Sequence, residues 1–123
     1  MPGTTSKQAS GNHAEDLACD YLQRHGLRLI QRNYRCRRGE IDLVMRHRQH
    51  TVFVEVRYRR SNRFGSAAES VDARKQAKLL AAAEHYLQHN PKAARGACRF
   101  DVVALSTENN QAQIHWIENA FQA

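Results

Sequence analysis

The chain has 123 residues, enough for one domain with a single modest core, and its apolar and charged fractions of 41% and 25% are those of a folded globular protein. Its longest apolar run, Leu79 to Ala83, is too short to cross a bilayer, and its N-terminal residues lack the hydrophobic region of a signal peptide, so we expect a cytoplasmic protein that does not cross a membrane. Three widely spaced cysteines without a CxxC pair exclude a disulfide framework and a cysteine zinc site.

The positive charge is concentrated in one part of the sequence. The net charge is +7, yet the stretch from Arg28 to Arg63 contains eleven arginines and only three acidic residues, Glu40, Asp42 and Glu55. The rest of the chain is nearly neutral. A basic block of this kind is either a solvated surface or the binding surface for a polyanion, with nucleic acid as the first candidate and an acidic membrane surface as the second.

The first half of the chain predicts a tail, a helix and three strands. Residues 1–10 are small and polar and predict a disordered tail, which leaves 11–123 as the folded domain. Apolar residues from Asn12 to His25 recur at helical spacing, and Gly26 predicts the end of that helix. Strands are predicted at Leu27–Arg35, Glu40–Arg46 and Thr51–Tyr58.

The second half predicts a loop, a second helix and two further strands. Residues 60–70 read as a loop, and Asp72 is a suitable N-cap for a helix that extends to about His89. Pro91 and Gly96 break this helix, and strands follow at Arg99–Leu105 and Gln113–Ile117. The order of a helix, three strands, a helix and two strands predicts a single α/β domain with helices packed on a mixed sheet.

The two central strands each carry an acidic residue on the face opposite their apolar residues. Strand alternation places Ile41, Leu43 and Met45 on one face and Asp42 on the other, while Val52, Val54 and Val56 lie opposite Glu55. An antiparallel hairpin that superimposes the two apolar faces pairs these residues as follows: Ile41 with Val56, Leu43 with Val54, Met45 with Val52, and Asp42 with Glu55. A two-residue turn at Arg48 and Gln49 and a four-residue loop, His47–His50, both permit this pairing. A register shifted by two residues would instead make Asp42 and Glu55 diagonal neighbours, still within reach of one bound ion.

Two carboxylates placed opposite each other repel unless something compensates for their charge. The neighbouring arginines, protonation of one carboxyl, or a divalent cation would each serve. Oxygen ligands favour Mg²⁺, Mn²⁺ or Ca²⁺ over zinc. A surface cluster of acids and arginines that balances itself is the structural alternative.

Several segments resemble the YraN-like family of small bacterial proteins, which are predicted nucleases of the PD-(D/E)xK superfamily, akin to Holliday-junction resolvases. In chain order they are GNHAEDLACDYL, GEIDLV, VFVEVRYR, RKQAKLLAAAEHYL, RFDVVAL and IENAF. The resemblance extends from about Gly11 to Phe121. It implies a restriction-endonuclease-like domain with a central mixed β-sheet flanked by α-helices, and Mg²⁺- or Mn²⁺-dependent hydrolysis of DNA, with structured or branched DNA as the substrate.

The resemblance also assigns roles to individual residues. Asp42 and Glu55 correspond to the acidic residues of the motif and Glu15 to an additional acid, so these three would hold the metal. Arg57 occupies the position of the motif lysine, and Lys75 and Gln76 lie in a segment where contact with substrate phosphate is expected. The arginines near the strand ends would bind the DNA backbone: Arg35, Arg37, Arg38, Arg59, Arg60 and Arg63. Resolvase-like action on a symmetric junction would favour a homodimer.

Arg57 is the departure from the motif. Arginine remains protonated at any working pH, so it stabilises negative charge but does not act as a base. Two functions therefore stay open from the sequence: an active endonuclease, in which this position serves only electrostatically, and a non-catalytic nucleic-acid-binding module with a degenerate nuclease site.

Overall fold

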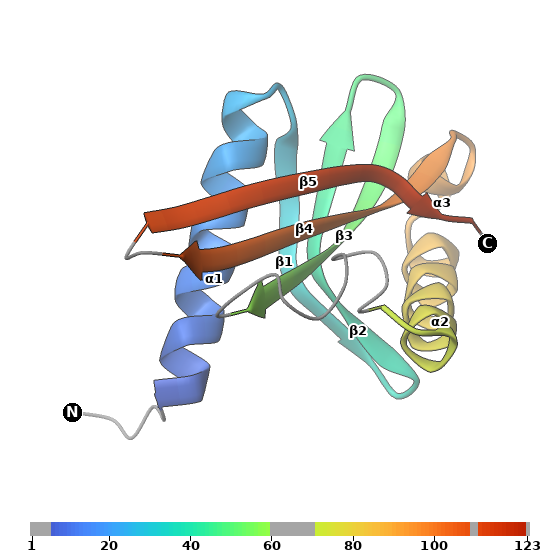
Figure 1. Ribbon diagram of the computed structural model, residues 1–123. Coiled ribbons are helices and arrows are strands. Elements are labelled where there is room, and N and C mark those ends of the chain that lie inside the picture. The colour runs from blue at the N-terminus through green and yellow to red at the C-terminus, as the bar shows by residue number, and fades with distance from the viewer. Residues whose placement is uncertain (1–5, 60–70, 109–110, 123) are drawn as a thin grey trace.

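The computed structural model describes residues 6–59, 71–108 and 111–122, and these form three helices and five strands (Figure 1). In chain order the elements are α1 (Ser6–Arg24), β1 (Arg28–Cys36), β2 (Gly39–His47), β3 (His50–Arg59), α2 (Ala73–His89), α3 (Pro91–Ala94), β4 (Cys98–Glu108) and β5 (Gln111–Phe121). The predicted order is confirmed, with α3 as an added single turn. The loop predicted over residues 60–70 lies outside the described residues. None of the helices in the described ranges is long and apolar enough to span a membrane.

The five strands form one mixed sheet in the order β1-β2-β3-β4-β5. Neighbouring strands are antiparallel except β3 and β4, which are parallel and are connected through α2. A parallel pair requires such a crossover because the chain must return to the same end of the sheet before the second strand begins. The predicted α/β domain with a mixed sheet flanked by helices is therefore confirmed.

Each face of the sheet is covered by one of the two long helices, which lie on opposite sides of it in Figure 1. On the α1 side, Ala18 and Leu22 pack with Val54 and other buried residues of β2, β3 and β4. On the α2 side, Leu79 packs with a second cluster that contains Phe53. Because Phe53 and Val54 are adjacent in β3 and point to opposite faces, the central strand is buried on both sides.

The predicted β2–β3 register is correct where the two strands pair. Leu43 lies opposite Val54 and Met45 opposite Val52, and the connection is a two-residue turn in which Arg48 adopts a positive φ of 59°. The prediction that Ile41 shares a face with Leu43 is wrong, because Ile41 packs in the cluster on the α2 side.

The change of face occurs at a distortion of the β1–β2 ladder. Asn33 lies between two paired positions, has a φ of 53°, and stands where a regular ladder would pair it with Asp42. The left-handed Asn33 lies beside the point in β2 where the side chains change face, since Leu43 packs in the cluster on the α1 side and Ile41 in the cluster on the α2 side. The predicted pairing of Ile41 with Val56 therefore falls outside the observed β2–β3 ladder.

The N-terminal prediction also needs correction. Helix α1 begins at Ser6, so the tail predicted over residues 1–10 overlaps the helix in its second half, while residues 1–5 lie outside the described part of the chain. The predicted start at Asn12 followed the apolar residues at helical spacing, which begin at Ala14, although Gly11 and Asn12 are only weak helix formers. Neither residue blocks helical conformation as a proline would.

Candidate functional site

Asp42 lies where the β2–β3 ladder ends. The last paired residues are Leu43 and Val54, and beyond them the Asp42 carboxylate accepts a hydrogen bond from the backbone N–H of Val56 at 2.8 Å. The side chain thus takes the place of a backbone acceptor that the diverging strands no longer provide. This bond fixes one carboxylate oxygen and holds Asp42 at the opening between β2 and β3.

Glu55 is the second acidic residue of the site and is 4% exposed. Its side chain shares a hydrogen bond with that of Asp42, which lowers the pKa of Asp42 and raises that of Glu55. Burial is the larger cause and raises both values, so the pKa of Glu55 reaches about 8. Two carboxylates form a hydrogen bond only when one holds a proton, and the backbone N–H that Asp42 accepts from Val56 favours Asp42 as the ionised partner.

Lys75 brings a positive charge to this pair from the first turn of α2. Its Nζ lies 3.7 Å from Oε1 of Glu55, and its charge lowers the pKa of both carboxyls. Asp72 is the N-cap predicted from the sequence, and its Oδ1 accepts a hydrogen bond from the Lys75 backbone N–H at 2.9 Å. The cap therefore fixes the start of α2 and, with it, the position of Lys75 over the carboxylates.

The resemblance also assigned roles to Arg57 and Gln76, and of these two the structure places only Arg57 close enough to affect the carboxyl pair. Arg57 follows Glu55 by two residues in β3, and its charge lowers the pKa of Glu55, though less than that of Lys75 does. The side-chain amide of Gln76 donates to the Val71 carbonyl at 2.9 Å, so it supports the entry into α2.

Glu15 is near the pair but has a partner of its own. Its Oε1 lies 3.4 Å from Nη2 of Arg32, whose Nη1 binds Asp16 at 2.7 Å. Burial and the negative charge of Asp42 raise the pKa of Glu15, so the two acids influence each other. Within the residues that the structure describes, no three His, Cys, Asp or Glu side chains form a cluster that could hold a metal ion. The structure therefore brings Asp42 and Glu55 together, whereas Glu15 forms an ion pair with Arg32.

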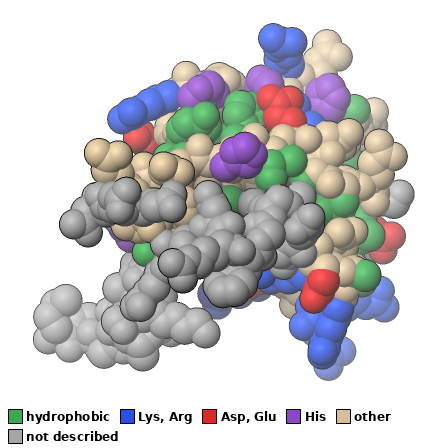
Figure 2. Space-filling view, in the orientation of Figure 1, with side chains coloured by type: hydrophobic (Ala, Val, Ile, Leu, Met, Phe, Trp, Pro, Cys, Tyr) green, Lys and Arg blue, Asp and Glu red, His purple; other side chains and the backbone are tan. Residues whose placement is uncertain are grey.

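Three of the six predicted DNA-binding arginines have side chains that the structure describes, and these three lie in the β1–β2 hairpin. Arg37 and Arg38 form the exposed turn between β1 and β2, and Arg35 pairs with Glu40 at 3.1 Å in the same hairpin. Figure 2 shows Lys and Arg side chains gathered at the lower right, over this hairpin tip and the beginning of α2. Arg60, Arg63 and the side chain of Arg59 lie outside the described residues.

Sequence reasoning did not predict the contacts of Arg32 or the ion pair of Lys75 with Glu55. Arg32 is one of many arginines in the basic stretch, and no local pattern distinguishes it from its neighbours. The position of Lys75 depends on how α2 crosses the sheet, and the N-cap at Asp72 was the only local signal for it. Asp101 is a structural residue, because its buried carboxylate accepts hydrogen bonds from Arg99, Trp116 and the Asn119 backbone.

Residues 14–105 match the family described as uncharacterised protein family UPF0102, a range that includes both acidic strands. A UPF0102 protein from Nitrosococcus oceani is 55% identical over 112 residues, which cover 91% of this chain and 90% of that protein. Another from Ectopseudomonas mendocina is 57% identical over 113 residues, covering 92% and 94%. A third, from Pseudomonas fluorescens, is 46% identical over 123 residues, the full length of both proteins. A match of this extent means that the chain belongs to the UPF0102 family.

Proposed function

We propose that this protein is a Mg²⁺- or Mn²⁺-dependent endonuclease that hydrolyses phosphodiester bonds in DNA, with structured or branched DNA as its substrate. The observation that carries the proposal is the pair of a half-buried Asp42 and a buried Glu55 at the end of the β2–β3 ladder, in which burial raises the pKa of both carboxyls, that of Glu55 to about 8. Perturbed acids of this kind are typical of catalytic sites. An isolated structural role does not account for two desolvated carboxylates that face each other.

The donor set fits a hard divalent cation. The charges of Lys75 and Arg57 compensate for the burial of Glu55 only in part, since its pKa stays raised to about 8. Carboxylate oxygens are the ligands that Mg²⁺ accepts. Mg²⁺ commonly takes only one or two protein carboxylates and leaves its remaining positions to water and substrate phosphate. Asp42 and Glu55 would therefore hold the ion, and Glu15 would join them directly or through water if Arg32 released it.

A bound cation would lower the pKa of a coordinated water and stabilise charge on the phosphoryl oxygens. The protein's own residues supply the remaining electrostatic stabilisation. Lys75 lies 3.7 Å from Glu55 and adds an ammonium group at the place where the scissile phosphate would meet the carboxylates. Arg57 adds a permanent positive charge from β3. The exposed arginines of the β1–β2 turn would bind the DNA backbone, with an affinity that falls with salt and little preference for sequence.

A non-catalytic nucleic-acid-binding module is the second candidate, and Arg57 is the observation that favours it. If the reaction needs an amine that gives up its proton at this position, arginine cannot provide it. The basic turn would then bind nucleic acid beside an inactive pair of acids.

One set of assays separates the two functions. Linear, flap and four-way-junction DNA are incubated with the protein and Mg²⁺, Mn²⁺ or a chelator, together with the Asp42→Asn and Glu55→Gln variants. Asp16→Asn, which removes an exposed carboxylate on the far side of Arg32, is the matched control. Metal-dependent cutting that both site variants abolish, while they still bind DNA, supports the endonuclease. Binding without cutting in every metal supports the module, and absence of binding at low salt contradicts both.

A further inference from the structure

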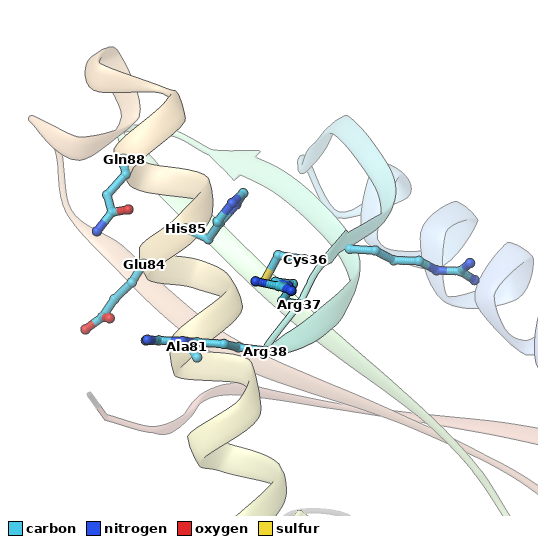
Figure 3. A pocket seen from close by; sticks show the side chains of 8 residues that line it. Cys36, Arg37, Arg38, Ala81, Glu84, His85 and Gln88 are labelled. Atoms are coloured by element: carbon cyan, nitrogen blue, oxygen red, sulfur yellow. The ribbon is translucent and has the colours of Figure 1, made fainter.

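A cavity separate from the acidic pair lies between the β1–β2 turn and the second half of α2. Its volume is about 580 Å³, within the range of small-molecule sites. Arg37 and Arg38 line it from the turn, and Glu84, His85 and Gln88 line it from α2. Figure 3 shows Arg37 directed toward the helix and His85 directed toward the hairpin.

The cavity is continuous with the surface that leads to the acidic pair. A second hollow of about 420 Å³ shares Arg37 and Arg38 with the first and is also lined by Lys75 and Lys78. Lys75 is the residue that pairs with Glu55. A strand that crosses the carboxylates would therefore reach the cavity over a mostly basic surface, on which Glu40 is paired with Arg35.

The walls of the cavity are held in place before any ligand binds. The hydroxyl of Tyr34 in β1 forms a hydrogen bond with Nδ1 of His85. The Tyr34 ring also packs edge-to-face with that of Tyr86, with a centroid distance of 5.2 Å. Gly39 lies so close to α2 that a Cβ at its position would be 2.6 Å from the Lys78 carbonyl oxygen. These contacts fix the hairpin tip against the helix, which lowers the ordering cost of binding.

The lining has two chemical halves, and this identifies the class of ligand. The two arginines suit a phosphate, because guanidinium groups bind phosphate oxygens bidentately. Glu84 and Gln88 are exposed on α2, and a carboxylate there repels a phosphate but accepts hydrogen bonds from the amino groups of a base. His85 adds an aromatic ring to the lining, and this ring is itself stacked on that of His89 with their centroids 4.3 Å apart. A phosphate and a base joined together are a nucleotide.

We propose that this cavity binds one unpaired nucleotide of a DNA strand, with the phosphate on Arg37 and Arg38 and the base against Glu84, His85 and Gln88. The inference rests on the proposed endonuclease function and specifies its substrate. A base inside a duplex keeps its pairing edge for its partner, whereas a base in a flap, branch or single strand offers that edge to the protein. Substrates with unpaired nucleotides next to the cut would be bound in preference to continuous duplex.

The test measures binding in the presence of chelator, so cutting does not contribute. Fluorescence anisotropy compares a labelled single-stranded oligonucleotide with a blunt duplex of the same sequence, for the wild-type chain and for Glu84→Ala/Gln88→Ala. We expect the wild type to prefer the single strand, and the double variant to lose about tenfold in affinity for it with little change for the duplex. Arg37→Ala/Arg38→Ala should weaken the binding of both ligands. It should also reduce by about two the number of counterions released on binding, as measured from the salt dependence of the affinity.

Glu118→Gln, which neutralises an exposed glutamate on β5, is the matched control, and thermal melts verify that each variant is folded. Removal of Glu84 would strengthen binding if the cavity only attracted phosphate, because a negative charge is lost. Unchanged or stronger single-strand binding by Glu84→Ala/Gln88→Ala therefore overturns the inference, as does equal binding of both ligands by the wild type. Cutting without this discrimination would refute the nucleotide site alone, and discrimination without cutting would refute the endonuclease alone.

Discussion

Glu55 and Asp42 occupy the two ends of one hydrogen bond, and their surroundings decide which of them holds the proton. Asp42 also accepts the Val56 N–H, which stabilises its ionised form, whereas Glu55 has the negative charge of Asp42 as a neighbour. Lys75 and Arg57 compensate in part. Because the pKa of Glu55 is raised to about 8, a cation that binds Glu55 near neutral pH replaces its proton.

The raised pKa of Glu55 predicts how stability depends on pH. In the folded protein this pKa is about 8, against an ordinary value of 4.5. Between these values the folded state keeps a proton that the unfolded chain has lost, so a rise in pH favours unfolding. We expect the free energy of unfolding to fall by up to about 1.4 kcal/mol per pH unit across this window. Glu55→Gln should remove most of this slope, as measured by urea unfolding at several pH values.

The comparison between the two proteins cancels the contribution of other titrating groups. Glutamine keeps the shape of the side chain and an N–H donor toward Asp42, so the variant should be at least as stable as the wild type near pH 8. Parallel pH profiles for the two proteins would mean that Glu55 titrates normally in the folded state.

Lys75 and Arg57 offer two positive charges to the same pair, and their substitution separates their roles. If Lys75 provides the charge that stabilises the transition state, Lys75→Met should reduce the cutting rate by about 100-fold, whereas Arg57→Lys should leave it close to wild type. Single-turnover cutting of flap DNA measures both, and Lys92→Met, at an exposed lysine of α3, is the control for loss of charge. A large gain from Arg57→Lys, with no loss from Lys75→Met, would assign the role to the β3 position.

Among the elements, the β4–β5 pair depends on a buried carboxylate at its irregular point. The register shifts between Phe100 and Val102, and Asp101 lies at this bulge with 1% exposure. Its Oδ1 accepts the backbone N–H of Asn119 at 2.9 Å, and its Oδ2 accepts the indole N–H of Trp116 at 3.0 Å. The carboxylate thus satisfies backbone and side-chain donors that the interrupted ladder leaves unpaired.

Asp101→Asn should therefore be strongly destabilising. The amide would retain some hydrogen bonds but would leave the guanidinium of Arg99, which contacts Asp101 at 3.0 Å, without its charge partner. Breaking a buried ion pair in this way costs about 3–5 kcal/mol, and urea unfolding monitored by Trp116 fluorescence would measure the loss. The exposed pair of Asp16 with Arg32 is the internal comparison, since Asp16→Asn should cost less than about 1 kcal/mol. Equal losses of stability in the two variants would show that the buried Asp101–Arg99 pair contributes no more than an exposed pair.

Elements and register were predictable from the sequence where local pattern decides them. The alternation of apolar residues in β2 and β3 gave the pairing of Leu43 with Val54, because any odd shift would have exposed the core. The face of Ile41 was not predictable, since no local pattern in the sequence marks the change of face between Leu43 and Ile41. The ion pair of Lys75 is a tertiary property, set by where α2 crosses the sheet.

At the scale of the whole molecule, charge is distributed so that the acidic pair borders positively charged surface. Arg37, Arg38, Lys75 and Lys78 line one hollow beside the site. On the other flank, Arg32 is balanced by Glu15 and Asp16. A polyanion would therefore approach from the side of α2 and the β1–β2 turn, and the acids would meet it at the end of that basic surface.

The proposed function also couples the stability of the whole domain to divalent cations. A cation that binds Asp42 and Glu55 must displace the proton of Glu55, so its affinity should increase with pH up to the Glu55 pKa of about 8. A ligand that binds only the folded state adds about 2.7 kcal/mol at 100 times its Kd. We expect millimolar Mg²⁺ to raise Tm near that pH, and to raise it much less about two pH units below. Calorimetry against NaCl of equal ionic strength measures the shift, and Asp42→Asn should abolish it. A Tm that responds equally to Mg²⁺ and NaCl at both pH values would contradict cation binding by the pair.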